Sequence, residues 1–343
     1  MKIDGNVGGP VNSDAVVNLA DIGAQVEAAE EIGYDGVWSA ETSHDPFLPL
    51  MTAADRSSDL TLGTSIAVAF ARNPMTVAAT ANDLQAYSGG RFILGLGTQI
   101  KAHIERRFSM PWSEPVKRMR EFIEALQAIW TAWESGGRLS FRGDFYRHTL
   151  MTPMFSPGAN PWGPPPVMLA AVGPKMTEVA AEVADGLLVH GFTTERYFRE
   201  VTMPQVLAGL EVSGRDREQF SVVYPGMIAT GTDEASFEAA CKRVRGQISF
   251  YGSTPAYRGV LELHGWGDLH TELHRLSLRG EWDTMAGLIE DDVLNTFAVV
   301  GEPDKVGAEV LRRFKGLVDR FSIYAPYNLD DGLRRQIVAD LHG

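Results

Sequence analysis

Short apolar runs alternate with longer amphipathic stretches along almost the whole chain. Most of these runs are continuously apolar, without alternation between apolar and polar residues, which is typical of parallel strands buried on both faces. We therefore predict eight strands, at Lys2–Val7, Gly36–Ala40, Leu60–Phe70, Phe92–Gly97, Val167–Val172, Gly186–His190, Phe220–Ile228 and Arg320–Ala325.

The stretches between the predicted strands have helical periodicity. In residues 14–32, apolar side chains recur at spacings of three and four residues, while the glutamates fall outside that stripe. Ser13 or Asp14 can cap this helix, and Gly33 ends it. Further helices are predicted over residues 118–133, from Pro303 to Gly316, and over about 330–341.

Eight strands, each followed by a helix, predict a single (β/α)8 barrel of the α/β class better than a doubly wound sheet. Residues 135–165, with a hairpin around Arg142–Asp144, and residues 249–301, with several short helices, interrupt this pattern. We interpret both as excursions, after the fourth and seventh strand–helix units, so that residues 1–343 form one domain. In such a barrel the chemistry lies at the carboxyl ends of the strands. These ends carry Asn6, Glu41, Thr42, His44, Thr98, His190, Tyr224, Tyr324 and the segments 65–70 and 171–175.

Composition narrows the class of protein. A hydrophobic fraction of 44% with 22% charged residues excludes a disordered or collagen-like chain. The net charge of −13 argues against a nucleic-acid or anionic-membrane partner. The lone cysteine, Cys241, excludes an internal disulfide framework and a multi-cysteine zinc site. The first residues form no apolar signal core and no apolar stretch is long enough for a bilayer, so we expect a cytoplasmic protein.

Three motifs suggest other chemistry and are better explained by the fold. Gly95-Leu-Gly97 opens like a dinucleotide fingerprint, but Ile100 replaces the third glycine and no helix is expected to begin directly after it. The segment 63–67 resembles a hydrolase nucleophile elbow, yet the predicted strand continues past its serine. His270 and His274 lie one helical turn apart, but a solvated helix face explains them better than a zinc site, and no metal is expected.

The segment from Val167 to Val179 is the strongest candidate for a ligand site. A buried strand ends in small residues, followed by Gly173 and by Pro174 in the first helical turn. The free N–H groups of that turn and its positive dipole end would face the barrel mouth beside Lys175, which suits an anion. An ordinary strand-to-helix turn is the alternative interpretation.

Glu41 and His44, near the end of the second strand, have the chemistry for proton transfer. A capping residue and a loop contact are the alternative roles. Trp38 is interpreted as packing inside the barrel.

Several fragments occur in the order found in one family. They are Gly36–Glu41 (GVWSAE), Leu62–Ile66 (LGTSI), Arg72–Pro74 (RNP), Ser88–Gly97 (SGGRFILGLG), Ala170–Pro174 (AAVGP) and Val183–Gly186 (VADG). The combination resembles the bacterial-luciferase-like superfamily, and within it the branch that uses the deazaflavin coenzyme F420. The resemblance is close over about residues 1–190 and looser beyond them.

The resemblance implies a TIM barrel that holds a flavin-shaped cofactor at its carboxyl mouth. In similar proteins the third strand carries a non-prolyl cis peptide bond that presses on one face of the ring, and here that bond would join Ser65 and Ile66. The cofactor phosphate would lie on the backbone of Val172, Gly173 and Pro174, beside Lys175. Asn6, Val68, Thr98 and His103 complete the implied cofactor site.

The chain departs from its relatives at two positions. Relatives often place His directly after the acid that ends the second strand, where this chain has Thr42, so that Glu41, Thr42 and His44 are the catalytic candidates. The sugar-phosphate dehydrogenase of the superfamily carries an acid shortly after the fourth strand. This chain has Ile100 there, which argues against that substrate.

Four functions follow as hypotheses. The first is an F420-dependent oxidoreductase that transfers hydride between the coenzyme and a small organic substrate, and the second is an FMN-dependent monooxygenase supplied with reduced flavin. The third, a hydrolase with paired carboxylates, requires a second acid near Glu41. The fourth is a barrel that binds a cofactor without catalysis. The resemblance also implies a homo-oligomer, such as a dimer. Aromatic residues of the two excursions are expected to roof an apolar pocket or to form dimer contacts; they are Phe145, Tyr146, Trp162, Tyr251, Tyr257 and Trp266.

Overall fold

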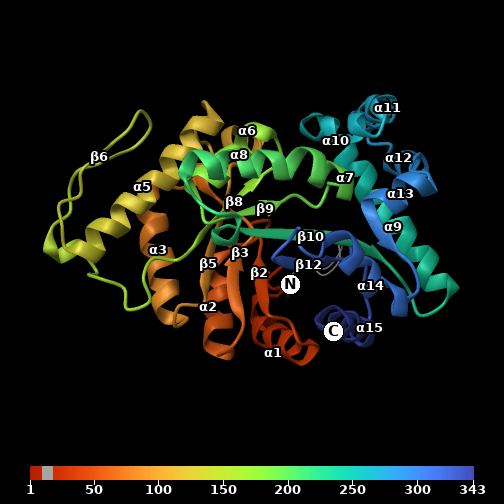
Figure 1. Ribbon diagram of the computed structural model, residues 1–343, viewed down its shortest axis with the longest axis horizontal. Coiled ribbons are helices and arrows are strands. Elements are labelled where there is room, and N and C mark those ends of the chain that lie inside the picture. The colour runs from red at the N-terminus through yellow and green to blue at the C-terminus, as the bar shows by residue number, and fades with distance from the viewer. Residues whose placement is uncertain (10–17) are drawn as a thin grey trace.

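The computed structural model describes residues 1–9 and 18–343, and its centre is a closed barrel of parallel strands (Figure 1). Within this part of the chain, eight strands pair in the order β1-β2-β3-β5-β8-β9-β10-β12, and β12 pairs again with β1. All eight coincide with predicted runs, so the (β/α)8 barrel is confirmed. The strands are β1 (Lys2–Asn6), β2 (Gly36–Ser39), β3 (Thr61–Thr64), β5 (Phe92–Gly97), β8 (Val167–Ala171), β9 (Gly186–Val189), β10 (Ser221–Ala229) and β12 (Arg320–Tyr324).

Helices surround the barrel and connect successive strands. They are α1 (Ile22–Ile32), α2 (Phe47–Arg56), α3 (Pro74–Tyr87), α5 (Pro115–Ser135), α6 (Pro174–Val183), α8 (Met203–Ser213), α14 (Pro303–Phe314) and α15 (Asp331–His342). Two short helices, α4 (Lys101–Arg106) and α7 (Glu195–Tyr197), lie in loops at the carboxyl ends of strands, and α4 was not predicted.

The first helix differs from its prediction. Leu19–Asp21 form a 3-10 turn capped by the side chain of Asn18, and the α-helix begins only at Ile22. The proposed caps Ser13 and Asp14 lie outside the described residues. Gly33 does end the helix, in the left-handed conformation with φ 92°, which glycine adopts without a steric penalty.

A cluster of buried side chains inside the barrel identifies the inward-facing side of five strands. Trp38, Ile93, Met168, Leu188 and Val223, from five different strands, form a buried cluster of their own. Trp38 therefore packs inside the barrel, as predicted. Because alternate residues of a strand share a face, the next inward positions toward the carboxyl ends are Ala40, Gly95, Ala170, His190 and Pro225, and Gly97 follows Gly95 on the same face.

A buried ion pair lies at the other end of the barrel interior. Asp4 accepts hydrogen bonds from Arg320 Nε at 2.7 Å and Nη2 at 2.6 Å, and from Trp38 Nε1 at 2.9 Å. The Asp4 side chain is 0% exposed and that of Arg320 is 10% exposed. Both carboxylate oxygens thus have donors, which a buried carboxylate requires.

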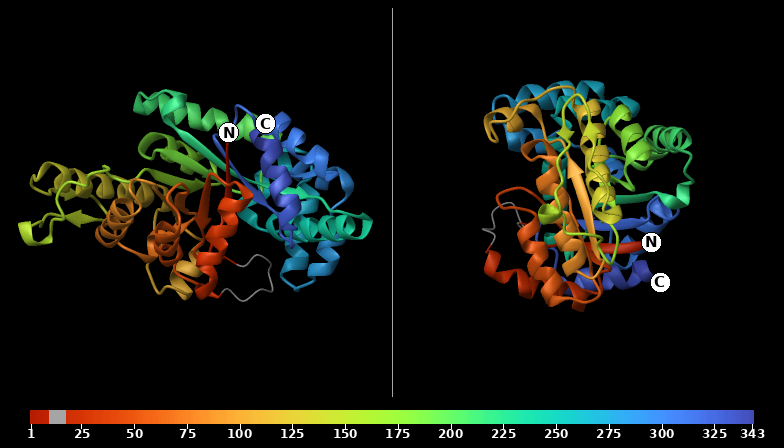
Figure 2. Two further views of the ribbon diagram at one scale, coloured as in Figure 1. Left: turned by 90° about the horizontal axis from the view of Figure 1, so that it is seen from below. Right: turned by 90° about the vertical axis from the view of Figure 1, so that its left-hand side faces the viewer.

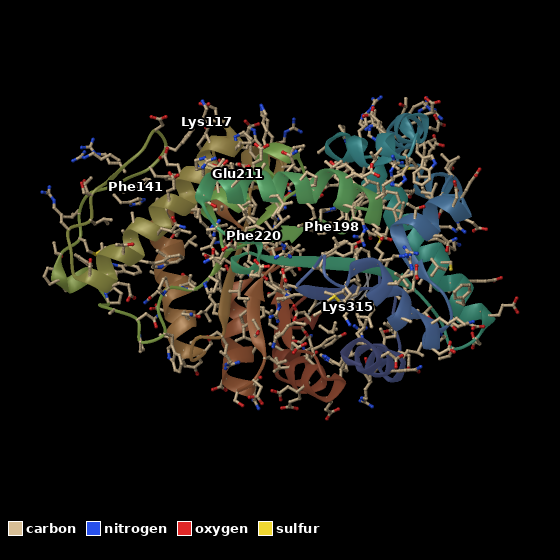
Figure 3. The ribbon with its side chains drawn as sticks, in the orientation of Figure 1. Lys117, Phe141, Phe198, Glu211, Phe220 and Lys315 are labelled. Atoms are coloured by element: carbon tan, nitrogen blue, oxygen red, sulfur yellow. The ribbon has the colours of Figure 1, made fainter. Side chains whose placement is uncertain are left out.

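The first excursion follows α5 and extends along its outer side (Figures 1 and 2). Strands β6 (Phe141–Arg142) and β7 (Arg147–His148) form the predicted hairpin, and the Glu121 carboxylate accepts the backbone N–H groups of Asp144, Phe145 and Tyr146 at its turn. Phe141 lies far from the barrel centre (Figure 3). Trp162 packs at Gly90, just before β5 and so at the opposite end of the barrel from the mouth, which makes its predicted place in a roof wrong.

The second excursion lies at the other end of the long axis (Figures 1 and 2). It contains α9 (Glu234–Gly252), α10 (Arg258–Leu263), α11 (Gly267–Ser277), α12 (Trp282–Gly287), α13 (Asp291–Phe297) and strand β11 (Ala298–Val300). These elements share a separate hydrophobic core with the last residues of β10. The inserted part therefore begins at Glu234, earlier than the predicted residue 249, and α14 is the helix that returns to the barrel.

Strand β11 extends the sheet beyond the barrel. Met227 pairs with Tyr324 of β12 on one side and with Ala298 of β11 on the other. Since β9 pairs only with Ser221–Val223, β11 continues the place of β9 past its end. The insertion is thereby anchored to the rim of the barrel.

Candidate active site

The carboxyl ends of β1, β2, β3, β5 and β8 form one side of the barrel mouth. The pairing order brings the predicted residues of these strand ends together, although they are spread over about half of the chain. The exposed end of β1 carries Asn6, and β8 is followed by a partly exposed Val172 and an exposed Gly173.

The third strand is interrupted by a cis peptide bond between Ser65 and Ile66, at the expected position. After it, β4 (Ala67–Val68) resumes the pairing with β5. Ser65 N–H donates to the carbonyl of Ser39 at 2.8 Å, and the Ile66 carbonyl accepts from Glu41 N–H at 3.2 Å. The bulge is therefore fixed to the end of β2.

The backbone at Gly95 and Gly97 is closely covered by the third strand and its bulge. A Cβ atom at Gly95 would lie 1.8 Å from the carbonyl oxygen of Thr64, and one at Gly97 would lie 2.6 Å from Cδ1 of Ile66. Ile66 thus lies against the bare backbone of β5, partly exposed at the mouth. With Ala40 and Ala170 at neighbouring inward positions, this side of the mouth presents small residues and one aliphatic side chain, a surface that suits a flat ring.

Glu41 contacts the backbone and a cation of the segment that follows the cis bond. Its Oε2 accepts the N–H of Val68 at 2.7 Å and pairs with Arg72 Nη1, and its side chain is only 7% exposed. Arg72 also donates to the Val68 carbonyl at 3.3 Å and to Asp45 at 3.0 Å. The carboxylate therefore holds the segment that follows the cis bond.

Asp45 is the second acid that a paired-carboxylate hydrolase requires near Glu41. The guanidinium of Arg72 pairs with both carboxylates. Neither acid is thus placed as a free general base, and the geometry does not support the hydrolase hypothesis.

The other catalytic candidates lie on the loop after Glu41. Thr42 is exposed, and its carbonyl accepts a hydrogen bond from Arg107 at 2.5 Å. His44 is partly buried. Both are on the rim, at the edge of the flat surface.

The end of β5 turns sharply. Gln99 has φ 61°, an uncommon left-handed conformation for a non-glycine residue. Thr98 Oγ1 donates to the Gln99 carbonyl at 2.9 Å, and the Gln99 side chain accepts the N–H of Ile100 at 3.0 Å. His103 is exposed on α4, which follows this turn.

The predicted anion cradle is at the mouth and open. Gly173 is the N-cap of α6, and no side chain caps that helix. Gly173, Pro174 and Lys175 are exposed, and a Cβ atom at Gly173 would meet nothing within 4 Å. The uncapped N–H groups and the positive end of the helix dipole therefore face solvent at the rim, so this turn fits a phosphate group.

A second cluster lies at the mouth, beside the ends of β9 and β12. His190 follows β9, Tyr324 ends β12, and Tyr251 and Tyr257 come from the second excursion. His190 Nε2 lies 3.2 Å from the Tyr257 hydroxyl, and the hydroxyls of Tyr251 and Tyr324 are 3.1 Å apart. Burial lowers the pKa of His190 to about 4 and raises the pKa of Tyr257 to about 12. His190 and Tyr324 were identified as strand ends, but only the fold brings the other two to them.

The remaining sequence candidates have structural roles. Tyr224 is fully buried against Phe314 and Phe321, outside the barrel. His270 is buried, so the predicted solvated face is wrong for it, and its Nδ1 contacts the Gly252 carbonyl at 2.7 Å. Among the described residues, no group of three acidic, histidine or cysteine side chains is arranged to hold a metal ion.

Two hollows lie outside the mouth, on the outer surface. One, of about 380 Å³, is lined by residues of α7 and α14, and the other, of about 460 Å³, by residues of α5. Neither contains a candidate residue. In residues 1–9 and 18–343, no helix combines the length and the apolar character needed to cross a bilayer.

The chain is similar in sequence to proteins from other organisms. The chain is 56% identical over 320 residues to the uncharacterized protein Rv1360 of Mycobacterium tuberculosis, covering 93% of this chain and 92% of that protein. It is 27% identical over 290 residues to the 5,10-methylenetetrahydromethanopterin reductase of Archaeoglobus fulgidus, covering 82% of each.

The fold is shared with a solved enzyme. The coenzyme F420 dependent tetrahydromethanopterin reductase from Methanopyrus kandleri superposes with a TM-score of 0.80 at 20% identity, over 99% of this chain and 98% of that one. The sequence pattern of the luciferase-like monooxygenase family matches residues 4–320. The chain therefore belongs to the luciferase-like monooxygenase family.

Proposed function

We propose that this protein is an F420-dependent oxidoreductase that transfers hydride between the coenzyme and a small organic substrate. The observation that carries the proposal is the position of an uncapped helix N-terminus at Gly173 on the same side of the mouth as the flat surface of Ile66 and Gly97. The proteins similar to this chain include a putative coenzyme F420-dependent oxidoreductase and a solved coenzyme F420 dependent reductase. Coenzyme F420 would supply the hydride chemistry, and the barrel would bind and orient it.

The proposal gives each candidate residue a role in binding the cofactor. The backbone N–H groups of Gly173 and Lys175, with the Lys175 side chain, would hold the phosphate, while Pro174, which has no N–H, sets the first helical turn. Ile66 and Val68 would support the ring from the bulge. The remaining predicted contacts, at the edge of the ring and its side chain, are Asn6, Ser65, Thr98 and His103.

The residues around the cis bond would determine the position of that support. Glu41 and Arg72 fix the Val68 backbone, so they act on the ring through the bulge and are positioning residues. Thr42 and His44 are the candidates on this rim for contact with the substrate. Self-association, which the resemblance implies, belongs to the same proposal and is tested by sedimentation.

A fluorescence titration of the purified protein with F420 tests the assignment. We expect a dissociation constant in the micromolar range or below. The Gly173→Asp variant places a negative charge where the phosphate would lie, and it should bind at least tenfold more weakly. Gly173→Ala adds a methyl group to open space and is the matched control for folding. Absence of binding by the unaltered protein at micromolar concentrations would contradict the proposal.

A flavin monooxygenase is the second candidate, since the family is described as luciferase-like monooxygenase and the same cradle suits the phosphate of FMN. Oxygen consumption with reduced FMN, together with no binding of F420, would select it. Binding of neither cofactor would favour the non-catalytic barrel or another function.

A further inference from the structure

We propose that His190, Tyr251, Tyr257 and Tyr324 form a binding site for the oxygen atom of an uncharged ketone or alcohol with an apolar body. The site lies at the carboxyl ends of β9 and β12, next to the phosphate cradle that follows β8. Such a site would determine the class of substrate of the proposed oxidoreductase, and in that respect the inference rests on the proposed function.

The hydrogen bonds of His190 fix its tautomer. The backbone N–H of Phe192 donates to Nδ1 at 3.0 Å, so Nδ1 carries a lone pair. In a neutral imidazole the proton is then on Nε2, which donates to the Tyr257 hydroxyl oxygen at 3.2 Å. Tyr257 accepts that bond and keeps its own O–H for another acceptor.

The hydroxyls of Tyr251 and Tyr324 also have one O–H proton that their shared hydrogen bond does not use. Tyr251 and Tyr324 share one hydrogen bond at 3.1 Å, in which one hydroxyl donates and the other accepts. Within the described structure, the hydrogen bonds of these three hydroxyls involve only each other and His190. The cluster therefore offers two O–H donors that have no acceptor among residues 1–9 and 18–343.

These donors carry no charge. Burial raises the pKa values of Tyr251, Tyr257 and Tyr324 and lowers the pKa of His190, so all four groups are neutral near pH 7. Neutral donors suit a carbonyl or hydroxyl oxygen, whereas a carboxylate or phosphate would lose its hydration without gaining an opposite charge. The chemistry of the cluster thus selects an uncharged ligand.

Aromatic rings hold the cluster together and supply an apolar wall. The His190 ring contacts Tyr251 and Tyr257 at centroid distances of 4.7 and 4.5 Å. Phe192 lies behind them, 5.8 Å from Tyr257 and stacked on Phe297 at 4.4 Å. Rings of this kind favour the apolar body of a ligand by excluding water.

The site adjoins the phosphate cradle on the same rim. Val189, the residue before His190, pairs with Ala171, two residues before Gly173. On the other side, β12, which ends in Tyr324, pairs with β1, which ends in Asn6. A ligand oxygen held by the cluster would therefore face the side of the mouth assigned to the cofactor.

Binding of ketones to the cofactor-free protein tests the inference separately from catalysis. Saturation-transfer NMR would be run with cyclohexanone, acetophenone and 2-nonanone, against methylcyclohexane and cyclohexanecarboxylate as probes without the neutral oxygen. We expect at least one ketone to bind more tightly than both. Tyr257→Phe should weaken ketone binding about 5-fold, the usual effect of losing one neutral hydrogen bond. Tyr197→Phe, in the same aromatic core, is the matched control and should leave it unchanged.

Several results would overturn the inference: no ketone binding, equal binding of the hydrocarbon or the carboxylate, or equal loss in both variants. The imidazole ¹⁵N shifts of His190 give a second measurement, because a proton on Nδ1 would refute the derived donor pattern. Ketone binding by a protein that fails to bind F420 would keep this site and reject the proposed function. F420 binding without ketone binding would reject this site and support the proposed function.

Discussion

Replacing His190 by Asn should remove a component of stability that is lost in acid. The ring contacts the Phe192 backbone N–H and the phenols of Tyr251 and Tyr257, and Tyr324 bonds to Tyr251. Burial lowers the pKa of His190 from 6.5 to about 4. Between these two values the unfolded chain binds a proton that the folded chain does not. The free energy of unfolding therefore falls as the pH decreases from about 7 to about 4.

The size of the effect follows from the shift. At 1.36 kcal/mol for each unit, a pKa lowered from 6.5 to about 4 corresponds to about 3 kcal/mol of unfolding free energy at pH 4. In His190→Asn, the side-chain oxygen can still accept the Phe192 N–H, but no group titrates. The difference in stability between the unaltered protein and this variant should thus shift by about 3 kcal/mol in favour of the variant between pH 7 and pH 4.

Urea unfolding at pH 7, 6, 5 and 4 measures this difference. His103→Asn, at an exposed position on α4, is the control and should give a curve parallel to that of the unaltered protein. Parallel curves for His190→Asn would refute the reasoning, because they would mean that the imidazole is protonated as readily in the folded protein as in the unfolded chain.

Three further substitutions test the rest of the mouth and the barrel interior. Glu41→Gln should cost about 2 kcal/mol of stability in thermal unfolding and weaken F420 binding, because Arg72 and the bulge lose a mostly buried carboxylate. Asp45→Asn is its control: this carboxylate lies on the exposed side of the same guanidinium, so its loss should cost under about 1 kcal/mol. Asp4→Asn leaves a buried guanidinium without its carboxylate and should cost about 3 to 5 kcal/mol in urea unfolding, and a cost below about 1 kcal/mol would contradict the buried pair. Gly97→Ala should leave a folded protein, because the new methyl group meets only the side chain of Ile66, whose end can move. The variant should nevertheless bind F420 more weakly in a fluorescence titration. Unchanged affinity would contradict the proposal that the cofactor ring lies on the surface of Ile66 and Gly97.

The strands were predictable because burial on both faces requires unbroken apolar runs. Phe92–Gly97 and Gly186–Val189 are examples in which the predicted and observed strands nearly coincide. The break after Thr64 was not visible in the apolar pattern and came only from the resemblance, since a cis bond leaves no hydrophobic signature. The start of α1 was also missed, because the helical spacing of residues 14–21 continues into a segment whose last residues form a 3-10 turn.

The site was harder to predict than the fold. Gly173 was found because a glycine followed by proline after a buried strand marks a helix N-terminus. His190 and Tyr324 were identified as strand ends, and Tyr251 and Tyr257 as residues around a pocket. Their contact with one another could not be predicted, because it depends on how the helix that begins at Glu234 packs against the barrel. Glu41 was found, but its pairing with Arg72 depends on the bulge and could not be read from sequence spacing.

The two parts of the mouth differ in how they are encoded. The part that carries Gly173 and Ile66 is built by strand ends and short loops, whereas the part beside β9 and β12 takes Tyr251 and Tyr257 from one continuous stretch between β10 and α14. Exchange of that single stretch with a homologous protein would reshape the ligand wall while the helix start at Gly173 stays intact. Evolution or an engineer can therefore vary what such an enzyme accepts through one segment, without rebuilding the place where its coenzyme would sit.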